Sequence, residues 1–398
     1  MERGSNDGHV TPPYLRRVVA PLTVAATLGA GLAVAPLGDN ALPAFASCGL
    51  VYTSAMNGRP TTTALPKGAS LRVWHDSRQT INQVYVPVSS PLALQVWTSG
   101  ALTRTNHPTA VLKSHGNGVA IMNGSVFDAG RGSLIAGPQV VDGVVNKAER
   151  TQHNAILIDK TGRKFGQGEV SIAGKVTAGG KSASITSLNW QSLSGGVGVY
   201  TAPWGSGWLP HGSVNVVVAN SIVKAIRHSN LSRAPGSGQT ILTGSGSTAT
   251  FLNGLHVGEA IAVAYHPVYE FHYGETPFPV WEGTDHGMPY WLDGTKWDVP
   301  CTSSNDTHYS RSAFGVDTKG NFWLFVCSGP SRSKYGGGCT HSEMQYYLKK
   351  MGAFNADQLD GDTSSTIAVR HAIGGSVFRV DKTNSFYQRS VPNYLAIM

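Results

Sequence analysis

The chain has 398 residues, of which 41% are hydrophobic and 14% charged, and it contains 48 glycines. This apolar content excludes an intrinsically disordered chain, and abundant glycine with sparse charge argues against a helical bundle. The formal net charge of +8 favours an anionic partner, but no Lys/Arg run or basic-aromatic stripe indicates nucleic acid. We therefore expect an α+β, strand-rich fold of mixed sheets with a few packed helices, and a phosphate-bearing glycan or cell-surface polymer as partner.

The N-terminus has the features of an export signal. Arg16 and Arg17 precede an apolar run over residues 18–37, and Ala44-Phe45-Ala46 supplies a small-x-small cleavage pattern. We predict that residues 1–46 are removed and that residues 47–398 form one catalytic domain that is secreted or extracytoplasmic. The alternative is a retained membrane anchor, which the glycines and proline within the run make less favourable. A membrane is therefore expected as a partner only if this segment stays uncleaved.

Short strands separated by polar or glycine-rich turns are predicted through the first part of the mature chain. They cover residues 71–74, 83–88, 93–97, 119–122, 155–159, 198–201, 214–219, 240–243 and 260–265. Residues 270–310 are rich in aromatics, Pro and Gly, and are predicted to form irregular loops.

The C-terminal part predicts better defined elements. Residues 311–317 and 321–327 form a strand pair, and the second strand is apolar on both faces, which indicates a central strand covered on both sides. Thr340 and Glu343 form a capping box at the start of a helix that Gly352 ends. A strand over residues 356–359 then leads into a loop at residues 360–366 and a strand at 367–369.

The four cysteines lie in the mature part of the chain and suggest two disulfides in an exported protein. They are Cys48, Cys301, Cys327 and Cys339. Cys327 with Cys339 is the expected local pair. Their spacing is not that of a zinc site, so all four are interpreted as structural.

Several spaced motifs, in order, resemble those of the phosphodiester glycosidase family. The most specific are Asn123-Gly124-Ser125-Val126-Phe127-Asp128 with the downstream Val140-Val141-Asp142-Gly143, then Arg311-Ser312-Ala313-Phe314-Gly315-Val316-Asp317, Gly338-Cys339-Thr340…Glu343, and Leu359-Asp360-Gly361…Ser364-Ser365-Thr366. Less specific pieces lie at residues 188–205, 241–258 and 287–294. The likeness covers most of residues 50–380, and it implies the family's fold.

The resemblance implies hydrolysis of a sugar-1-phosphodiester, with a carboxylate that activates water or stabilises the sugar cation and with groups that hold the phosphate. The predicted catalytic residues are Asp360, Glu343 and Asp128. The predicted substrate or phosphate ligands are Arg311, Asn123, Thr340, Gly361, Ser364 and Ser365. For most of these a structural role is the open alternative: a capping box for Thr340 and Glu343, a turn for Asn123 and Asp128, and an ion pair for Arg311. His153, His286 and His341 are expected to be polar or solvated.

The sequence departs from the family pattern in the last loop. Asp362 and Thr363 stand where the family has two glycines, and Ser125 stands where the first motif has a second glycine. An added carboxylate repels phosphate unless something compensates it. One hypothesis is a divalent cation, such as calcium, held by Asp360 and Asp362. The others are a changed substrate, or a catalytically impaired protein that still binds sugar phosphates.

Overall fold

The structure, a computed structural model, describes residues 54–150, 153–190, 195–205, 212–228, 234–272, 276–299, 307–329, 337–381 and 388–398. All of them belong to one compact unit, Ala46–Met398. The predicted export segment, Cys48 and Cys301 lie outside the described residues. Within these ranges no helix has the length and apolar character needed to cross a membrane.

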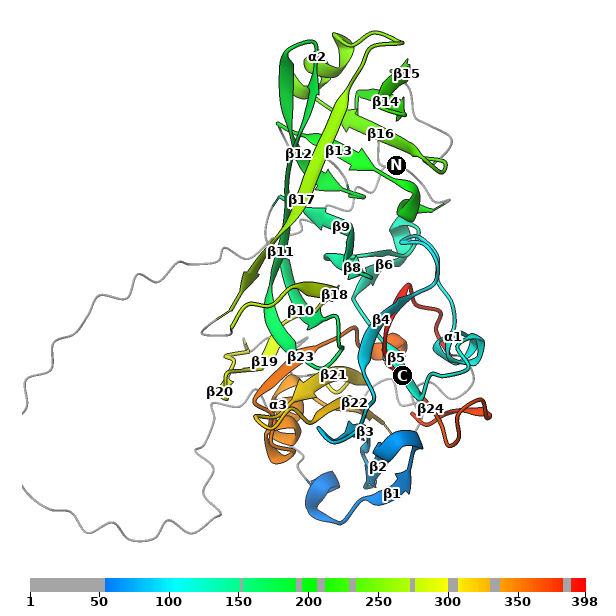
Figure 1. The fold of residues 1–398 in the computed structure, drawn as a ribbon. Coiled ribbons are helices and arrows are strands. Elements are labelled where there is room, and N and C mark those ends of the chain that lie inside the picture. The colour runs from blue at the N-terminus through cyan, green and yellow to red at the C-terminus, as the bar shows by residue number, and fades with distance from the viewer. Residues whose placement is uncertain are drawn as a thin grey trace, which may run out of the picture. The chain divides into compact units, whose positions relative to one another are not determined.

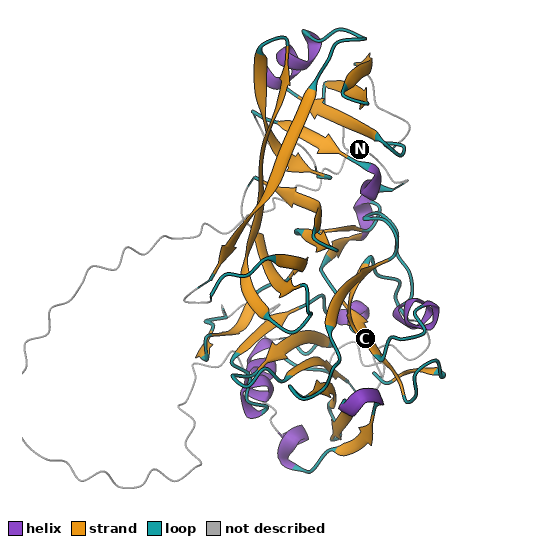
Figure 2. Cartoon of the chain, in the orientation of Figure 1, coloured by secondary structure: helices purple, strands orange, loops and turns teal. Residues whose placement is uncertain are grey.

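Strands dominate the fold, as expected, and form three large sheets and one small one (Figures 1 and 2). The first large sheet has eight strands in the order β1-β2-β3-β22-β21-β23-β19-β20. Their bounds are β1 Thr61–Ala64, β2 Ser70–His75, β3 Thr80–Val86, β19 Pro289–Leu292, β20 Thr295–Lys296, β21 Arg311–Val316, β22 Phe322–Ser328 and β23 Asn355–Gln358.

The second sheet has five strands in the order β25-β24-β5-β26-β4. Their bounds are β4 Leu94–Thr98, β5 Ala120–Asn123, β24 Ile367–Arg370, β25 Val377–Arg379 and β26 Asn393–Ile397. The two-stranded sheet joins β6 (Phe127–Asp128) to β7 (Leu134–Ile135). Strand β4 is an edge strand, with β26 as its neighbour in the sheet.

The third sheet has eleven strands in the order β15-β14-β16-β13-β12-β9-β8-β18-β10-β11-β17. Their bounds are β8 Gln139–Val141, β9 Val144–Glu149, β10 His153–Asp159, β11 Phe165–Ala178, β12 Lys181–Leu188, β13 Val197–Tyr200, β14 Val214–Ala219, β15 Ile222–Arg227, β16 Gln239–Gly244, β17 Ala262–Phe271 and β18 Val280–Asp285. The pairing of β12 with β13 is parallel, and the other pairings of the described strands are antiparallel.

Three helices, α1 (Pro108–Ser114), α2 (Ser247–Asn253) and α3 (His341–Lys350), are described together with short 3₁₀ turns. The turns are η1 Ser54–Asn57, η2 Pro66–Gly68, η3 Ala129–Arg131, η4 Ala202–Trp204 and η5 Asp362–Ser364. The capping box of α3 is confirmed, and Gly352 follows the helix with φ +89°, which is the left-handed conformation expected of a terminating glycine.

The side chains of β22 show how the layers are built. Phe322, Leu324 and Val326 belong to the core between the eight-stranded and five-stranded sheets, while Trp323 and Phe325 join the core beneath α3. A strand of period two buries both faces only if both are covered, so the prediction of a central strand is confirmed. On the far side of the five-stranded sheet, Ile121 packs with α1. The layers therefore run α3, eight-stranded sheet, five-stranded sheet, α1.

One sequence prediction about the fold is wrong. Residues 270–310 are not irregular throughout, because β18, β19 and β20 lie within them. Strand β18 reads Val-Trp-Glu-Gly-Thr-Asp and buries Glu282, Thr284 and Asp285. Buried polar residues replace the apolar ones that a sequence pattern uses to recognise a strand.

Replacing Phe325 by alanine tests the core beneath α3. Its side chain is fully buried, so Phe325→Ala should lower the free energy of unfolding by about 3–5 kcal/mol. The matched control is Phe378→Ala on β25, whose side chain is 47% exposed and which should cost less than about 1 kcal/mol. Urea unfolding of the purified variants measures both, and equal losses would contradict this packing.

Candidate active site

The loop after Leu359 crosses from one sheet to another. It leaves β23 in the eight-stranded sheet, runs through η5, and enters β24 in the five-stranded sheet. Its backbone is tied to both sides, because Asp360 N donates to Gly124 O at 3.0 Å and Asp362 N donates to Ser310 O at 2.6 Å. The carboxylates and hydroxyls of this loop are therefore held at the junction of two sheets.

The side chain of Asn123 stabilises this junction through three hydrogen bonds. Its Nδ2 donates to Asp360 O at 2.7 Å, and its Oδ1 accepts from Thr366 N at 3.1 Å and from Ser312 Oγ at 2.8 Å. The side chain is fully buried at the end of β5. Asn123 thus holds the first and last residues of the loop and contacts β21, which is a positioning role, while its predicted contact with substrate stays a prediction.

The next residues of the first motif explain two features of the sequence. A Cβ at Gly124 would overlap Oδ1 of Asn393 at 2.5 Å, so a side chain is excluded there. Ser125, where the family has a glycine, is buried, and its Oγ lies 2.7 Å from Thr284 Oγ1 and accepts from Asn393 Nδ2 at 3.0 Å. The hydroxyl is satisfied inside the protein, so this departure is accommodated by a structural hydrogen-bond network.

Asp360 carries the unusual electrostatics of the loop. Burial raises the pKa of its carboxyl to about 6, although hydrogen bonds from Ser364 and Gly361 and the charge of Arg389 act in the opposite direction. Asp362 raises this pKa further by like-charge repulsion. A carboxyl whose pKa is raised into this range exchanges a proton near neutral pH, which is the property required of a general acid or base.

Arg389 is the cation of the loop, and the sequence analysis did not identify it. Its Nη1 donates to Thr363 Oγ1 at 3.1 Å and to Ser364 Oγ at 3.0 Å, and its guanidinium lies 4.6 Å from the centre of the Phe127 ring. Ser364 in turn donates a hydrogen bond to Asp360. No motif marks Arg389, because it lies 23 residues beyond Thr366 in sequence and only the fold returns it to the loop.

The positive charge of Arg389 bears on the calcium hypothesis. Calcium requires six to eight oxygen ligands. Among the described residues no group of three or more His, Cys, Asp or Glu side chains is arranged to hold a metal. Asp362 is exposed, whereas the carboxylate of Asp360 already accepts the Gly361 N–H at 2.9 Å and lies near Arg389. These residues fit a site neutralised by arginine better than a calcium site.

Several backbone N–H groups of the loop already have acceptors within the protein, so they are not free to bind phosphate. Gly361 N donates to Asp360 Oδ1, Ser364 N to Gly361 O at 3.1 Å, and Ser365 N to Asp362 O at 3.2 Å. A phosphate would therefore meet hydroxyls and Arg389 more readily than backbone donors. The Oγ of Ser365 is fully buried and makes no hydrogen bond within the described part of the chain, so its predicted contact with substrate stays a prediction.

Arg311 is buried and its guanidinium is engaged by the protein. Nε donates to Cys339 O at 2.6 Å, Nη2 donates to Thr307 O at 3.0 Å, and Nη1 donates to Nε2 of His341. His341 is buried and neutral, since burial and then Arg311 lower its pKa to about 3. The geometry favours the structural alternative for Arg311, and its phosphate contact stays a prediction.

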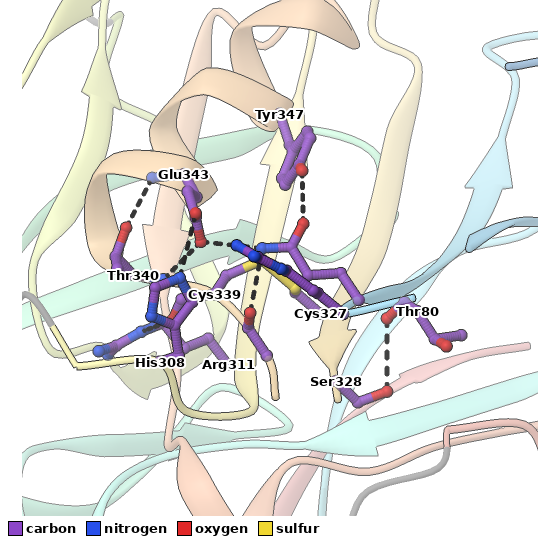
Figure 3. The surroundings of a disulfide bond; sticks show 12 residues. Thr80, His308, Arg311, Cys327, Ser328, Cys339, Thr340, Glu343 and Tyr347 are labelled. Carbon is purple, nitrogen blue, oxygen red and sulfur yellow. Dashed lines mark hydrogen bonds and ion pairs between the residues drawn. A yellow bond between two sulfur atoms is a disulfide. The ribbon is translucent and has the colours of Figure 1, made fainter. Parts of the chain in front are cut away.

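A disulfide and a capping box beside Arg311 hold the start of α3 in place (Figure 3). The disulfide Cys327–Cys339, predicted as the local pair, joins β22 to the residue before Thr340. Thr340 accepts Glu343 N at 3.1 Å, and Glu343 accepts Thr340 N at 2.9 Å while its other oxygen lies 3.2 Å from His308 Nε2. These are the contacts of a capping box, so catalysis by Glu343 and phosphate binding by Thr340 remain untested predictions.

Asp128 lies at the surface. Its side chain is exposed, and its Oδ1 accepts Gly130 N at 2.8 Å in a turn, which is the structural role that the sequence left open. The first motif instead meets the loop through Phe127, whose ring contacts Arg389. A catalytic role of Asp128 stays a prediction.

Two further buried charges, also missed from sequence, lie near the loop. Asp285 at the end of β18 feels the charge of Asp360, and burial raises its pKa, an effect that Lys147 partly offsets. Lys147 is buried and donates to Ala136 O at 2.7 Å and Gly137 O at 2.9 Å. A Cβ at Gly137 would overlap the Asp285 carboxylate, so this glycine makes room for a second acidic group near Asp360.

Of the three histidines expected to be polar or solvated, two are buried rather than solvated. His286 and His341 are only 3% and 4% exposed. Burial lowers the pKa of His286 to about 3, so it is neutral although it lies 3.5 Å from Asp357. His153 is partly exposed and lies 3.5 Å from Glu149.

Residues 212–398 match the family model described as phosphodiester glycosidase, a range that contains Arg311, Thr340, Glu343 and the whole loop. No match was found among the curated proteins.

Solved structures similar to the chain include the following three. A hypothetical protein from Synechocystis has a TM-score of 0.64 at 21% identity over 83% of this chain, which spans 61% of that protein's length. A protein from Burkholderia pseudomallei K96243 whose name describes it as exported has a TM-score of 0.60 at 16% identity, covering 83% of this chain and 74% of that one. These likenesses support the fold alone.

The third structure is the catalytic domain of zebrafish N-acetylglucosamine-1-phosphodiester alpha-N-acetylglucosaminidase, auto-inhibited by its pro-peptide. It is 12% identical and covers 87% of this chain and 86% of that one, with a TM-score of 0.41 that is too low to carry an argument. The assignment depends on the motifs and the family model. The expected resemblance is confirmed: residues 212–398 of this chain match the phosphodiester glycosidase family model.

Proposed function

We propose that the chain is an exported hydrolase that cleaves the glycosidic bond of a sugar-1-phosphodiester in a cell-surface or secreted glycan. The observation that carries the proposal is the half-buried Asp360, with its pKa raised to about 6, in the loop that matches the family motif. The Cys327–Cys339 disulfide and the signal-like residues 1–46 support export. The second candidate is a sugar-phosphate-binding protein of the same fold without turnover, which the departures at Asp362 and Thr363 favour.

Hydrolysis of a sugar-1-phosphodiester does not require a strong general acid. Water attacks the anomeric carbon, the bond from that carbon to the phosphate oxygen breaks, and the electron pair leaves with the phosphate monoester. Phosphate monoesters are weak bases, so their departure needs no strong proton donor, whereas the attacking water must lose a proton. Above about pH 6 the Asp360 carboxylate is largely ionised and can accept that proton.

Asp360→Asn tests this role directly. Release of free sugar from a UDP-sugar or from a sugar 1-phosphate ester should fall by about 10²–10⁴-fold, because the amide accepts no proton. In the unsubstituted protein the rate should fall as the pH is lowered through about 6, where the carboxylate becomes protonated. The control is Asp298→Asn, at an exposed position, which should keep full activity.

The result also decides between the two candidates. Sugar release that survives in Asp360→Asn would remove Asp360 from the mechanism. A complete lack of turnover across a panel of sugar-1-phosphodiesters, together with calorimetric binding of a sugar 1-phosphate, would establish the binding protein instead.

The ionisation of Asp360 can be tested without substrate. Because its pKa is raised on folding, the folded protein binds this proton more tightly than the unfolded chain, and stability is lost as the pH rises through the window from about 4 to 6. Asp360→Asn removes this loss, so the variant should gain roughly 2–3 kcal/mol relative to the parent between about pH 4 and about pH 7. Urea unfolding at both pH values measures it, and a difference independent of pH would mean that the carboxyl is not buried as described.

Arg389 should act on substrate binding. Arg389→Gln removes the guanidinium that contacts Thr363 and Ser364, and KM should rise about tenfold or more because a charged phosphate contact is lost. Arg389→Lys should retain part of the affinity through its charge. Arg227→Gln on β15, an exposed arginine, is the control. An unchanged KM in Arg389→Gln would contradict the assignment of Arg389 to the phosphate.

A further inference from the structure

A pocket of about 360 Å³ lies apart from the loop at 360–366. It is bounded by the edge strand β4, the residues after α1, the turn between β8 and β9, and β18, and it contains none of the predicted site residues. Its volume falls in the range of small-molecule sites. The side chains that give it chemical character are Gln95, Trp97, His115, Asn117, Asp142 and Glu282.

Glu282 is the central group of this pocket. Its side chain is 3% exposed, and its Oε1 receives a long contact of 3.5 Å from Asp142 N, while Val96 on β4 provides a backbone hydrogen bond. Its Oε2 is buried and makes no hydrogen bond within the part of the chain that the structure describes. A buried polar atom without a partner costs free energy, which a donor on a ligand would recover.

The charge of the pocket indicates the sign of that ligand. Asp142 and Glu282 are the acidic residues of the lining, and among its described residues there is no Lys or Arg, although the chain carries a net charge of +8. Burial, together with Asp142, raises the pKa of Glu282 to about 8. Glu282 therefore holds a proton at pH 7 when no cation is near, and an entering cation would displace it.

The size and walls of the pocket favour an organic cation over a metal ion. Trp97 and His115 both line the pocket and stack with ring centres 4.0 Å apart and planes 23° apart, which gives the pocket an aromatic side. No metal-holding group of three or more His, Cys, Asp or Glu is found among the described residues, and 360 Å³ is far more space than one ion fills. Aromatic faces and carboxylates together are the usual surroundings of an ammonium group.

We propose that this pocket binds a small organic ammonium compound of about the size of an amino sugar, with its amine against Glu282 and Asp142. Asp142 belongs to the Val140-Val141-Asp142-Gly143 motif, which the site at Asp360 does not use. The backbone of Asp142 is left-handed, with φ +52°, and the following Gly143 packs on Trp281, so the turn has a defined backbone that carries this exposed carboxylate at the pocket. The amide groups of Gln95 and Asn117 would meet the hydroxyls of the ligand.

Calorimetric titration of the purified protein with glucosamine, glucose and N-acetylglucosamine at about pH 6.5 tests the proposal, because the three sugars share one ring and differ in the charged amine. Glucosamine should bind at least tenfold more tightly than the other two. Titrations in two buffers of different ionisation enthalpy should show proton release on binding, since Glu282 gives up its proton and the other titratable lining groups are Asp142 and His115.

The variants locate the site. Glu282→Gln has the shape of the protonated acid and should fold normally but lose glucosamine affinity by at least tenfold. Asp142→Asn keeps a residue that tolerates the left-handed backbone and should lose several-fold. Glu169→Gln on β11, outside the pocket, is the matched control and should bind as the parent does.

Four outcomes would overturn the proposal. They are no binding of glucosamine, equal binding of all three sugars, binding of Ca²⁺ alone that excludes glucosamine, and a loss in Asp360→Asn equal to that in Glu282→Gln. The last would place the amine in the candidate active site. Because this assay needs no turnover, its result is independent of the proposed hydrolase activity.

Discussion

The candidate site depends on one carboxamide. Asn123 donates to Asp360 O and accepts from Thr366 N and Ser312 Oγ, so one buried side chain joins both ends of the loop and the strand beside it. Only an amide offers a donor and an acceptor in this geometry, because Asp lacks the donor and Leu lacks both. The loop has few apolar side chains of its own, so hydrogen bonds rather than packing define its conformation.

The structure shows how the loop accommodates Asp362 and Thr363 in place of the two family glycines. Asp362 has φ +53°, a left-handed conformation that suits glycine and that Asp adopts more readily than most residues. The hydroxyl oxygen of Thr363 accepts a hydrogen bond from Arg389, which also donates to Ser364 Oγ. The added carboxylate is therefore accompanied by a guanidinium that contacts the same loop, and the repulsion that Asp362 would exert on a phosphate is opposed locally, without a bound metal.

Sequence reasoning succeeded where the signal is local. The strand pair β21 and β22, the capping box of α3 and the pair Cys327–Cys339 each follow from residues close together in the chain. Arg389 and Asp285 were missed because the fold brings each of them near the loop from a distant part of the chain, and no spacing in the sequence records this. For Arg311 the motif predicts a phosphate ligand, which stays a prediction, and the fold adds hydrogen bonds to Cys339 O and Thr307 O that the motif did not indicate.

Strand β18 connects these observations. It carries Glu282 at the pocket beside β4, Thr284 in the network with Ser125 and Asn393, and Asp285 near Asp360. Burial raises the pKa of both carboxyls. A strand between β8 and β10 would be more stable with apolar residues, because burying a carboxyl costs free energy that its hydrogen bonds recover only in part. Such costs are concentrated where a protein binds ligands or moves protons. The same polar residues also prevented the recognition of β18 as a strand, because they interrupt the hydrophobic pattern. The segment least recognisable in sequence is therefore the one whose chemistry points most directly to binding.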